Sequence, residues 1–483
     1  MKIRLLTIIL LTAFLLNCNK EDRGNVGSFN SEGQLVAYDT IGTVITGRPT
    51  KNSIVLNILF NKQTEICVEY SLKSNQYNYI TKFHKTDSGA PYELLISGLT
   101  SGSRYYYRLK YKFPESINYV YSSEFSFCTA KERGVSFNFG VQGDSHPERA
   151  GKMFNSTLYK INLQNVSAKA PDFYFTLGDD FSIEHIIEKG LVNSILIDKV
   201  YEEHRKYLGI VGCNSSLFLI NGNHEQAAKY LLDGTANNPS VIASNSRKKY
   251  YPLPFPDEFY SGDKDLVQFT GLLGDYYSFE WGDALFVVID PYWHSDIPVD
   301  NKAGSMEKSE DDPWKITLGD IQYYWFKQTL ESSSSKHKFV FSHHVSGTGR
   351  GGIEVSHLYE WGGYNQKNVW EFNKMRPNWS SPIHKLMSDN KVDIFFQGHD
   401  HLFAKQERDG VIYQTVPSPA DDTYSAFNST AYKSGVVYPN SGFLNIKVST
   451  NNITVEYIGS FIDSEQYPIN KNRKTIYSYS INK

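Results

Sequence analysis

Apolar residues follow two different patterns along the chain, and the change between them divides it into two parts. From residue 34 to 131 the apolar runs are short, rich in aromatic and β-branched residues, and separated by turns: SIVLNILF, ICVEYSL, YELLISGL, RYYYRLKY and EFSFCTA. Runs of this composition and spacing are typical of an all-β sandwich. The first pattern therefore predicts a β-sandwich domain over 34–131.

After the polar stretch TAKERGV the apolar runs become buried strands that end in glycine or polar residues, with longer segments between them. Two of these segments, 191–208 and 318–331, have the spacing of amphipathic helices. Strands that alternate with helices predict an α/β domain, here over 132–483. In such domains the functional residues gather at the carboxyl ends of the strands.

Five of the predicted strands end in residues that can bind a metal ion. These residues are Asp144 and His146 in GDSH, Asp179 in LGDD, Asn223 and His224 in NGNHE, His343 in SHH, and His399 and His401 in GHDH. One such end is equally consistent with a loop of solvated histidines. Five ends in succession are different, because buried Asp, Asn and His side chains need partners and a cation can partner all of them. The pattern therefore predicts a metal site with nitrogen and oxygen ligands.

The order of these blocks, D-x-H, G-D, G-N-H-E, H and G-H-x-H, resembles the calcineurin-like metallophosphoesterases over roughly 135–405. The resemblance implies an αββα core, in which two sheets pack between helices, and a site for two divalent metal ions. It also implies the role of each residue. Asp144, His146 and His401 would hold the first metal, Asn223, His343 and His399 the second, and Asp179 would bridge them. His224 would not bind metal but would protonate the leaving oxygen or orient the phosphate.

Three further residues are weaker candidates. His344 could exchange roles with its neighbour His343, or support it from behind. Asp180 could accept a hydrogen bond from a ligand histidine, with an exposed carboxylate as the alternative. Arg350, in the GTGRGG loop that follows His343, could contact the substrate phosphate. A plain surface arginine explains Arg350 equally well.

The segment LTSGSRYYYRLKY, with Leu99, Gly102 and Tyr105 to Tyr107, resembles the tyrosine corner of a fibronectin-III-like sandwich. Such a domain precedes the catalytic domain in purple acid phosphatases. Those enzymes have an iron-binding tyrosine where this chain has Ser182, and they lack the counterpart of His146. The resemblance therefore implies a colourless site with divalent metals, and leaves Mn, Fe and Zn open.

The chain begins with features of a secreted lipoprotein. MKIRLLTIILLTAFLLNC has a basic start, a short apolar run and a cysteine, and it resembles a bacterial lipoprotein signal with Cys18 as the lipidated residue. We expect a signal peptide at 1–18, a linker at 19–33, and a lipid anchor in the cell envelope of a Gram-negative bacterium, in the outer membrane. Lys20-Glu21-Asp22 resembles a signal for the outer face of that membrane, with a solvated linker as the alternative.

Charge and cysteine content narrow the function. The formal net charge of −3 gives no reason to expect nucleic acid as a partner. Cys67, Cys128 and Cys213 do not have the spacing of metal ligands, and a disulfide between Cys67 and Cys128 is left open.

The resemblance thus predicts a hydrolase of phosphate esters that attacks phosphorus with a hydroxide shared by two metal ions. Monoesters are the first choice of substrate. The alternatives are a phosphodiesterase or nucleotidase on the same scaffold and, more remotely, a non-catalytic surface lipoprotein that binds glycans or partners.

Overall fold

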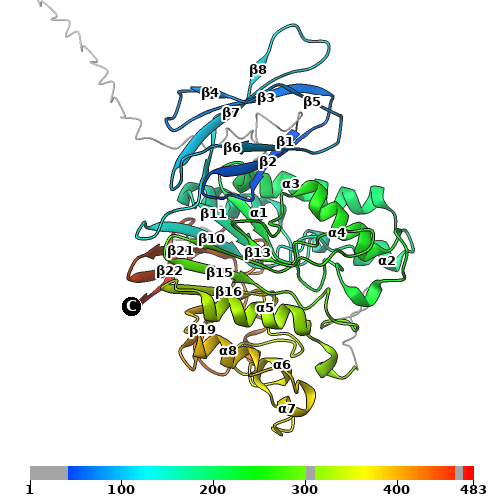
Figure 1. Cartoon of the computed structure of the whole chain (residues 1–483), viewed down its shortest axis with the longest axis vertical. Coiled ribbons are helices and arrows are strands. Elements are labelled where there is room, and N and C mark those ends of the chain that lie inside the picture. Colours follow the sequence, from blue (N-terminus) through cyan, green and yellow to red (C-terminus); the bar gives the residue numbers. More distant parts are fainter. Residues whose placement is uncertain (1–41, 301–310, 463–470) are drawn as a thin grey trace, which may run out of the picture.

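The first strands of the chain alternate buried and exposed side chains, as expected where one face of each strand packs against a second sheet. In RYYYRLKYK (Arg104–Lys112) every second residue is buried. The computed structural model describes residues 42–300, 311–462 and 471–483, and Figure 1 shows these first strands as a separate β-rich region above a larger α/β domain. Cys18, the signal peptide at 1–18 and the linker at 19–33 lie outside the described residues. Among the described helices, none is long and apolar enough to cross a membrane.

The N-terminal region consists of two antiparallel sheets that face each other across a common apolar core. One sheet has the order β1-β2-β6, with the bounds Gly42–Gly47, Ser53–Phe60 and Tyr92–Ser97. The other has the order β4-β3-β7-β8, with β5 paired to β3 and β9 to β7. Its strands are β3 Thr64–Ser71, β4 Tyr79–Ile80, β5 His84–Thr86, β7 Arg104–Lys112, β8 Val120–Tyr121 and β9 Phe125–Cys128.

A tyrosine ties the start of β7 to the loop before it. The hydroxyl of Tyr105 accepts a hydrogen bond from the backbone N–H of Thr100 at 2.8 Å. Gly102 lies between them with φ +66°, a conformation that a glycine adopts without steric cost. The hydroxyl contact of a tyrosine corner is therefore present, and Tyr105, of the three tyrosines in the segment, makes it.

The α/β domain is built on two sheets. The first has the order β12-β11-β10-β21-β22-β23, and the second the order β13-β14-β15-β16-β17-β19-β18-β20. The strands of the first are β10 Phe137–Gln142, β11 Phe173–Thr176, β12 Ser216–Leu219, β21 Gly442–Ser449, β22 Asn452–Gly459 and β23 Thr475–Asn482. Those of the second are β13 Ser261–Gly262, β14 Tyr277–Trp281, β15 Ala284–Val288, β16 His337–Phe341, β17 Ile394–Gln397, β18 Phe403–Arg408, β19 Val411–Thr415 and β20 Val436–Tyr438.

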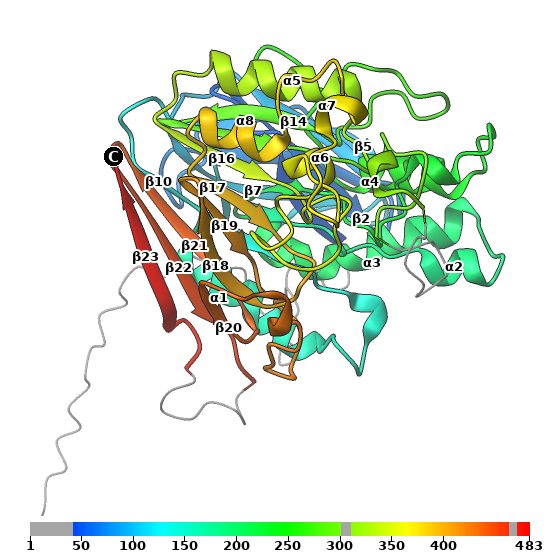
Figure 2. The same ribbon diagram turned by 90° about the horizontal axis from the view of Figure 1, so that it is seen from below.

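Helices cover the outer faces of both sheets, while phenylalanines fill the space between the sheets. Phe139 of β10 packs edge-on against Phe286 of β15 and Phe339 of β16, with ring centroids 5.2 and 5.4 Å apart. One outer layer contains α1 Ser156–Lys169, α2 Glu184–Glu188, α3 Ser194–Gly212 and α4 Pro239–Tyr250. The other contains α5 Gly319–Ser332, α6 Tyr359–Gly362, α7 Phe372–Met375 and α8 Ile383–Asp389. Figure 2 shows α5 and α8 on one side of the sheets and α1 on the other. The αββα arrangement expected from the sequence is confirmed.

The sandwich is joined to the α/β domain through α3. The guanidinium of Arg205 is fully buried and donates to the side-chain oxygens of Thr43 and Asn57, each at 2.8 Å. Nearby, the hydroxyl of Tyr107 donates to the carbonyl of Cys213 at 2.8 Å. The same guanidinium also donates to the carbonyl of Tyr250 in the α/β domain. A buried charge that has oxygen partners in both regions fixes how the two regions meet.

The three described cysteines are buried free thiols. Cys67 lies on β3 and Cys128 on β9, and β7 runs between these strands. The disulfide that the sequence left open is therefore not formed. Burial raises the pKa of the Cys67 thiol to about 11, which keeps it protonated.

Candidate metal centre

The predicted metal ligands follow five strands, three neighbouring strands at one side of the first sheet and two from the middle of the second. In the first sheet β10, β11 and β12 are parallel neighbours, and in the second β16 and β17 are parallel neighbours. Parallel strands place their carboxyl ends at one edge, so the loops after these five strands meet there. All eight residues singled out at these ends are buried: Asp144, His146, Asp179, Asn223, His224, His343, His399 and His401.

The first predicted group converges on a carboxylate oxygen. Oδ2 of Asp144 lies 3.2 Å from Nε2 of His401 and 3.7 Å from Nε2 of His146. This oxygen has no hydrogen-bond partner among the described residues although it is completely buried. A buried carboxylate oxygen in that position fits a cation, and the surrounding nitrogen and oxygen atoms suit a divalent metal ion.

The second predicted group forms around His343. Its Nε2 lies 3.1 Å from Oδ2 of Asp179 and 3.1 Å from Oδ1 of Asn223. Nδ1 of His399 lies 3.3 Å from the same nitrogen. Oδ2 of Asp179 is also 3.6 Å from Nε2 of His146, so this carboxylate stands between the two groups.

The backbone at these ends adopts conformations that non-glycine residues seldom take. His146, Asp179, His399 and His401 have φ values of 50, 57, 65 and 58°. Each such residue costs about 1 to 3 kcal/mol, and these conformations cluster at functional sites. Glycines allow the close approach, since a Cβ on Gly398 would collide with Oδ1 of Asp144.

A buried glutamate links two of the loops. The carboxylate of Glu225, from the GNHE block, accepts hydrogen bonds from the backbone N–H groups of Asp179 at 3.0 Å and Asp180 at 2.7 Å. It also accepts one from Gly222 of its own loop. Burial, together with the charges of Asp179 and Asp180, raises the pKa of Glu225 to about 7. Glu225 therefore fixes the position of Asp179 from behind.

The electrostatics of the centre favour a positive charge between its carboxylates. Burial alone would raise the pKa of Asp144, but His343 and His401 hold it at about 2. Burial alone would lower the pKa of His343, but Asp179 and Asp144 raise it to about 10. Burial, with further contributions from His344 and Arg350, holds the pKa of His399 well below its usual range. A neutral imidazole is the form of histidine that binds metal.

The geometry agrees with a match to a known family. The family model for calcineurin-like phosphoesterases matches residues 137–403, which is more than half of the chain. The chain belongs to the calcineurin-like phosphoesterase family. The phosphoesterase is also similar in structure to PhoD, with a TM-score of 0.64 and 14% identity over 92% of this chain and 91% of that chain. This likeness shows a shared fold that includes the N-terminal β-rich region.

A lower similarity is found to a putative 5'-nucleotidase from Staphylococcus aureus, with a TM-score of 0.35 and 15% identity over 69% of this chain and 56% of that chain. A search of curated proteins found no relative of the chain.

His224 of the phosphoesterase sits between groups of opposite charge. Its Nδ1 lies 3.0 Å from Oε2 of Glu184, and its Nε2 lies 3.0 Å from Nη2 of Arg149. Burial alone would lower its pKa, but Asp179 and Glu184 raise it to about 9. Its ring packs edge-on against His146 at 5.1 Å, so it borders the predicted ligands.

Four charged residues at the centre were missed from the sequence. Oε1 of Glu148 lies 2.8 Å from Nδ1 of His146, and Oδ2 of Asp300 lies 3.4 Å from Nε2 of His399. The other two are Arg149 and Glu184, which flank His224. Glu148, Arg149 and Glu184 follow predicted ligands within five positions, and this proximity in the sequence is the signal that they lie near the centre. Asp300 carries no comparable signal, because it comes from a separate loop.

The three weaker candidates have different outcomes. Asp180 is completely buried, so the exposed carboxylate that was its alternative is wrong; it accepts hydrogen bonds from Ser145 and from Gln142 (3.2 Å), and its role behind a ligand histidine stays a prediction. His344 stacks on His399 with ring centroids 4.5 Å apart, and its ring nitrogen lies close enough to those of His343 and His399 for all three to hold a metal ion, so the exchange of roles with His343 stays a prediction. Its neighbour His343 is the one whose Nε2 faces Asp179 and Asn223. Arg350 lies at the edge of the centre, where Nη1 donates to Asp400 at 3.0 Å.

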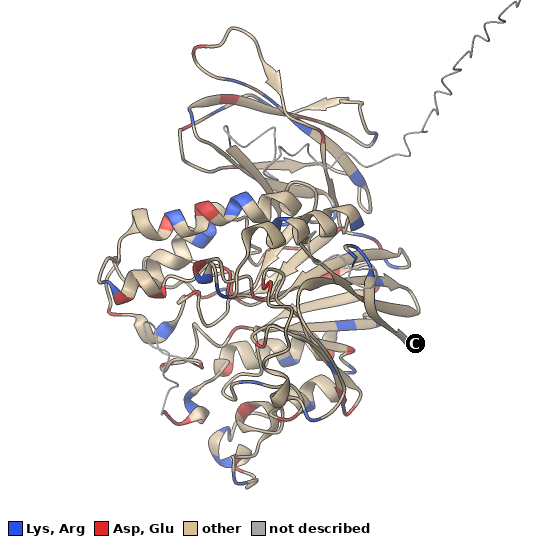
Figure 3. Ribbon diagram, turned by 180° about the vertical axis from the view of Figure 1, so that it is seen from behind, with Lys and Arg blue, Asp and Glu red and all other residues tan. Residues whose placement is uncertain are grey.

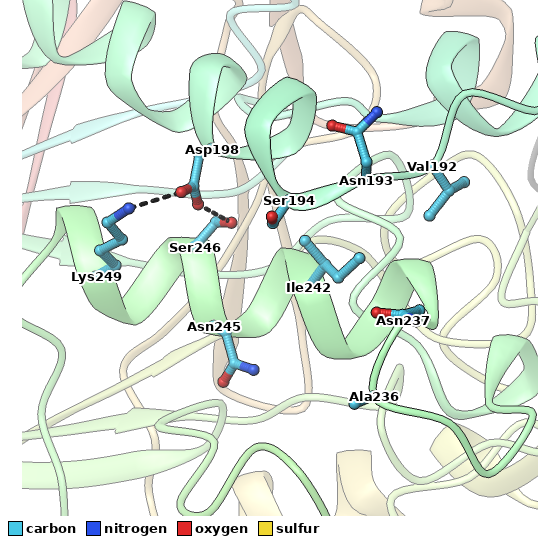
Figure 4. A pocket seen from close by; sticks show the side chains of 10 residues that line it. All are labelled: Val192, Asn193, Ser194, Asp198, Ala236, Asn237, Ile242, Asn245, Ser246 and Lys249. Carbon is cyan, nitrogen blue, oxygen red and sulfur yellow. Dashed lines mark hydrogen bonds and ion pairs between the residues drawn. The ribbon is translucent and has the colours of Figure 1, made fainter. Parts of the chain in front are cut away.

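No comparable group of candidate catalytic residues lines the cavity between α3 and α4. This cavity has a volume of about 600 Å³ and contains none of the predicted ligands. There Asp198 already accepts from Ser246 at 2.6 Å and Lys249 at 2.7 Å, as Figure 4 shows. In Figure 3, basic and acidic residues are interspersed over the ribbon, in keeping with the small net charge.

Proposed function

We propose that this phosphoesterase hydrolyses phosphate esters, with monoesters preferred, and that it uses two divalent metal ions, Mn, Fe or Zn. One observation carries the proposal. The buried ligand atoms form two overlapping groups, Asp144, His146 and His401 in one and Asp144, Asp179, His343 and His399 in the other, with Oδ1 of Asn223 3.1 Å from Nε2 of His343. Asp179 lies between them and would contact both ions.

Bound there, two divalent ions would supply the Lewis acidity that activates water and neutralises charge on the phosphoryl oxygens. The chain itself supplies a proton and a positive charge beside them. Glu184 faces Nδ1 of His224, which leaves Nε2 directed toward Arg149 and the ligand groups. A guanidinium only donates, so Nε2 of His224 accepts from Arg149 in this structure. Once Arg149 pairs with the phosphate, a protonated His224 would donate from Nε2 to the leaving oxygen or to a phosphoryl oxygen. Arg149 pairs with the phosphate, since a guanidinium matches its geometry.

A phosphodiesterase or nucleotidase would use the same residues, and the choice between monoester and diester depends on the walls of the site. A non-catalytic binding lipoprotein is the remaining alternative. The complete set of predicted ligands argues against this alternative. Strained backbone and buried polar side chains cost stability, and a binding protein without a reaction would gain nothing from that cost.

We also propose that the chain is lipid-anchored through Cys18 in the outer membrane of a Gram-negative cell. The basic and apolar N-terminal sequence that ends in this cysteine supports the proposal. The N-terminal region would be the fibronectin-III-like domain found in purple acid phosphatases. Its sheet order and the Tyr105 contact support that relationship.

The test compares hydrolysis of p-nitrophenyl phosphate and bis-p-nitrophenyl phosphate by the purified protein, first stripped of metal and then supplied with Mn, Zn or Fe. We expect activity that returns with metal and favours the monoester. Asn223→Ala should abolish it, whereas Asn75→Ala in the sandwich should retain it. A preference for the diester would move the alternative enzyme to first place. If the protein binds no metal, the proposal is wrong.

A further inference from the structure

A half-exposed phenylalanine stands beside the metal centre. The ring of Phe427 meets that of His401 nearly at right angles, with centroids 5.8 Å apart. His401 is only 3% exposed, whereas Phe427 is 50% exposed. A single exposed apolar residue is ordinary on a protein surface. What distinguishes Phe427 is that its ring borders a predicted metal ligand.

The loop that carries Phe427 is fastened on both sides of it. Before it, the backbone N–H of Ser425 donates to Oδ1 of Asn440 at 2.9 Å. After it, Nδ2 of Asn428 donates to the carbonyl of Asp400 at 3.1 Å, and the hydroxyl of Tyr432 donates to Oδ2 of Asp400 at 2.6 Å. Asp400 lies between His399 and His401, so these bonds tie the loop to the ligand loop itself. The ring is thus held next to the centre while one side remains open to solvent.

A row of neighbouring rings connects Phe427 to His224, the residue proposed to face the leaving oxygen. His401 adjoins His146 with centroids 4.9 Å apart, and His146 adjoins His224 at 5.1 Å. The polar end of this row, His224 with Arg149, suits the phosphate. Its other end is the phenyl ring of Phe427, which carries no polar atom and suits an apolar group.

We infer that Phe427 forms the wall of the substrate site that packs against the organic group of the ester, and that the preferred substrates carry an aromatic ring there. The inference rests on the proposed function, and it adds a substrate class: phosphate monoesters of aryl or other ring-bearing alcohols. Aromatic rings prefer offset or edge-on contacts, and such a pair strengthens binding by about three- to tenfold beyond the area that it buries. Because the contact exists before and during the reaction, it should act on KM more than on kcat.

The test measures binding and turnover separately in the metal-loaded protein. Phenylphosphonate and methylphosphonate are used as inhibitors, since they differ in the ring and cannot be hydrolysed. Phenyl phosphate and methyl phosphate are used as substrates. In Phe427→Ala we expect the inhibition constant of phenylphosphonate to rise about three- to tenfold and that of methylphosphonate less than twofold. KM for phenyl phosphate should rise with little change in kcat.

Two variants control for other causes. Phe427→Tyr keeps the ring and should bind phenylphosphonate as the unchanged protein does. Phe269→Ala removes an equally exposed phenyl, 49% exposed, from a loop near α4, and should change neither inhibitor. Phe427→Leu serves if the alanine variant folds poorly.

The outcomes separate the two proposals. Equal effects of Phe427→Ala on both phosphonates, with both esters hydrolysed, would overturn the inference and leave the proposed function standing. No hydrolysis of either ester and no binding of either phosphonate by the metal-loaded protein would overturn both.

Discussion

The sandwich and the phosphoesterase domain differ in whether their buried side-chain nitrogens and oxygens have hydrogen-bond partners. In the described part of the sandwich, residues 42–131, every buried side-chain nitrogen and oxygen has a hydrogen-bond partner. Glu124 is typical, since it accepts from Ser74, Asn75 and Tyr77. In the other domain, Oδ2 of Asp144 and Nδ1 of His401 are buried without one. Other buried atoms of this domain, such as the hydroxyl of Tyr201 and Nδ2 of Asn162, also lack a partner, but those of Asp144 and His401 lie together at strand ends, where a cation could partner them.

The backbone shows the same difference. Outside glycine, the sandwich has left-handed residues at Arg48 and Asn75, which are not among its buried polar residues. In the phosphoesterase domain four predicted metal ligands are left-handed and buried. Strain of this kind persists only where the surroundings impose it. Left-handed residues also occur elsewhere in that domain, but only at the predicted site do four of them coincide with buried charged or imidazole side chains, so the backbone strain there has a cost in stability.

The largest expected effect comes from removing the carboxylate between the two ligand groups. We expect Asp179→Asn to lower kcat/KM for p-nitrophenyl phosphate by about 10³-fold or more, because an amide offers one neutral oxygen where the carboxylate faces both groups. Metal content, measured by elemental analysis, should fall as well. Asp87→Asn in the sandwich is the matched control and should change neither. Full activity in Asp179→Asn would mean that the buried polar residues of the phosphoesterase domain do not form a metal centre, and the contrast with the sandwich would fail.

Metal removal should affect the stability of one domain only. An ion that binds the folded state at 1,000 times its dissociation constant stabilises it by about 4 kcal/mol. We expect chelation to lower the calorimetric transition of the phosphoesterase domain by several degrees, and restored metal to reverse the change. Unchanged transitions on chelation would mean that the unpartnered atoms of Asp144 and His401 do not bind metal.

A smaller effect is expected at Glu184, whose Oε2 lies 3.0 Å from Nδ1 of His224. Glu184→Gln should lower kcat by about tenfold to 100-fold with little change in KM, because general acid catalysis contributes about 10²- to 10⁴-fold and the orienting carboxylate accounts for part of it. The effect should be much smaller in a His224→Asn background, since the two residues act together. Glu188→Gln, on the same short helix and exposed, is the control. Additive effects of the two substitutions would contradict this role.

The contrast also explains what the sequence could predict. The grouping of the predicted ligands could be foreseen because each follows a buried strand, and strand order alone brings such ends together. The tyrosine corner was found because its partners are five residues apart. Phe427 and Asp300 were missed because long loops carry them to the centre, and the path of a loop depends on contacts that no local pattern records. The partners of Asp180 were not foreseen for a related reason: Ser145 and Gln142, which donate to it, come from another strand end.

The smallest expected effect lies in the sandwich, at the hydroxyl of Tyr105. Tyr105→Phe removes the acceptor of the Thr100 N–H and leaves the ring, which stacks on Phe127 with centroids 5.5 Å apart. We expect a loss of about 1 kcal/mol in the free energy of unfolding, measured with urea, because a net hydrogen bond contributes about that much. Activity should not change, since this hydroxyl serves the fold and not the site.

Tyr106→Phe is the control for that experiment, because its side chain lies on the opposite face of β7. It should leave both stability and activity unchanged. If Tyr105→Phe lowered activity with stability intact, the sandwich would be coupled to the metal centre, through the Arg205 contacts that join it to α3. The two regions would then have to be treated as one functional unit.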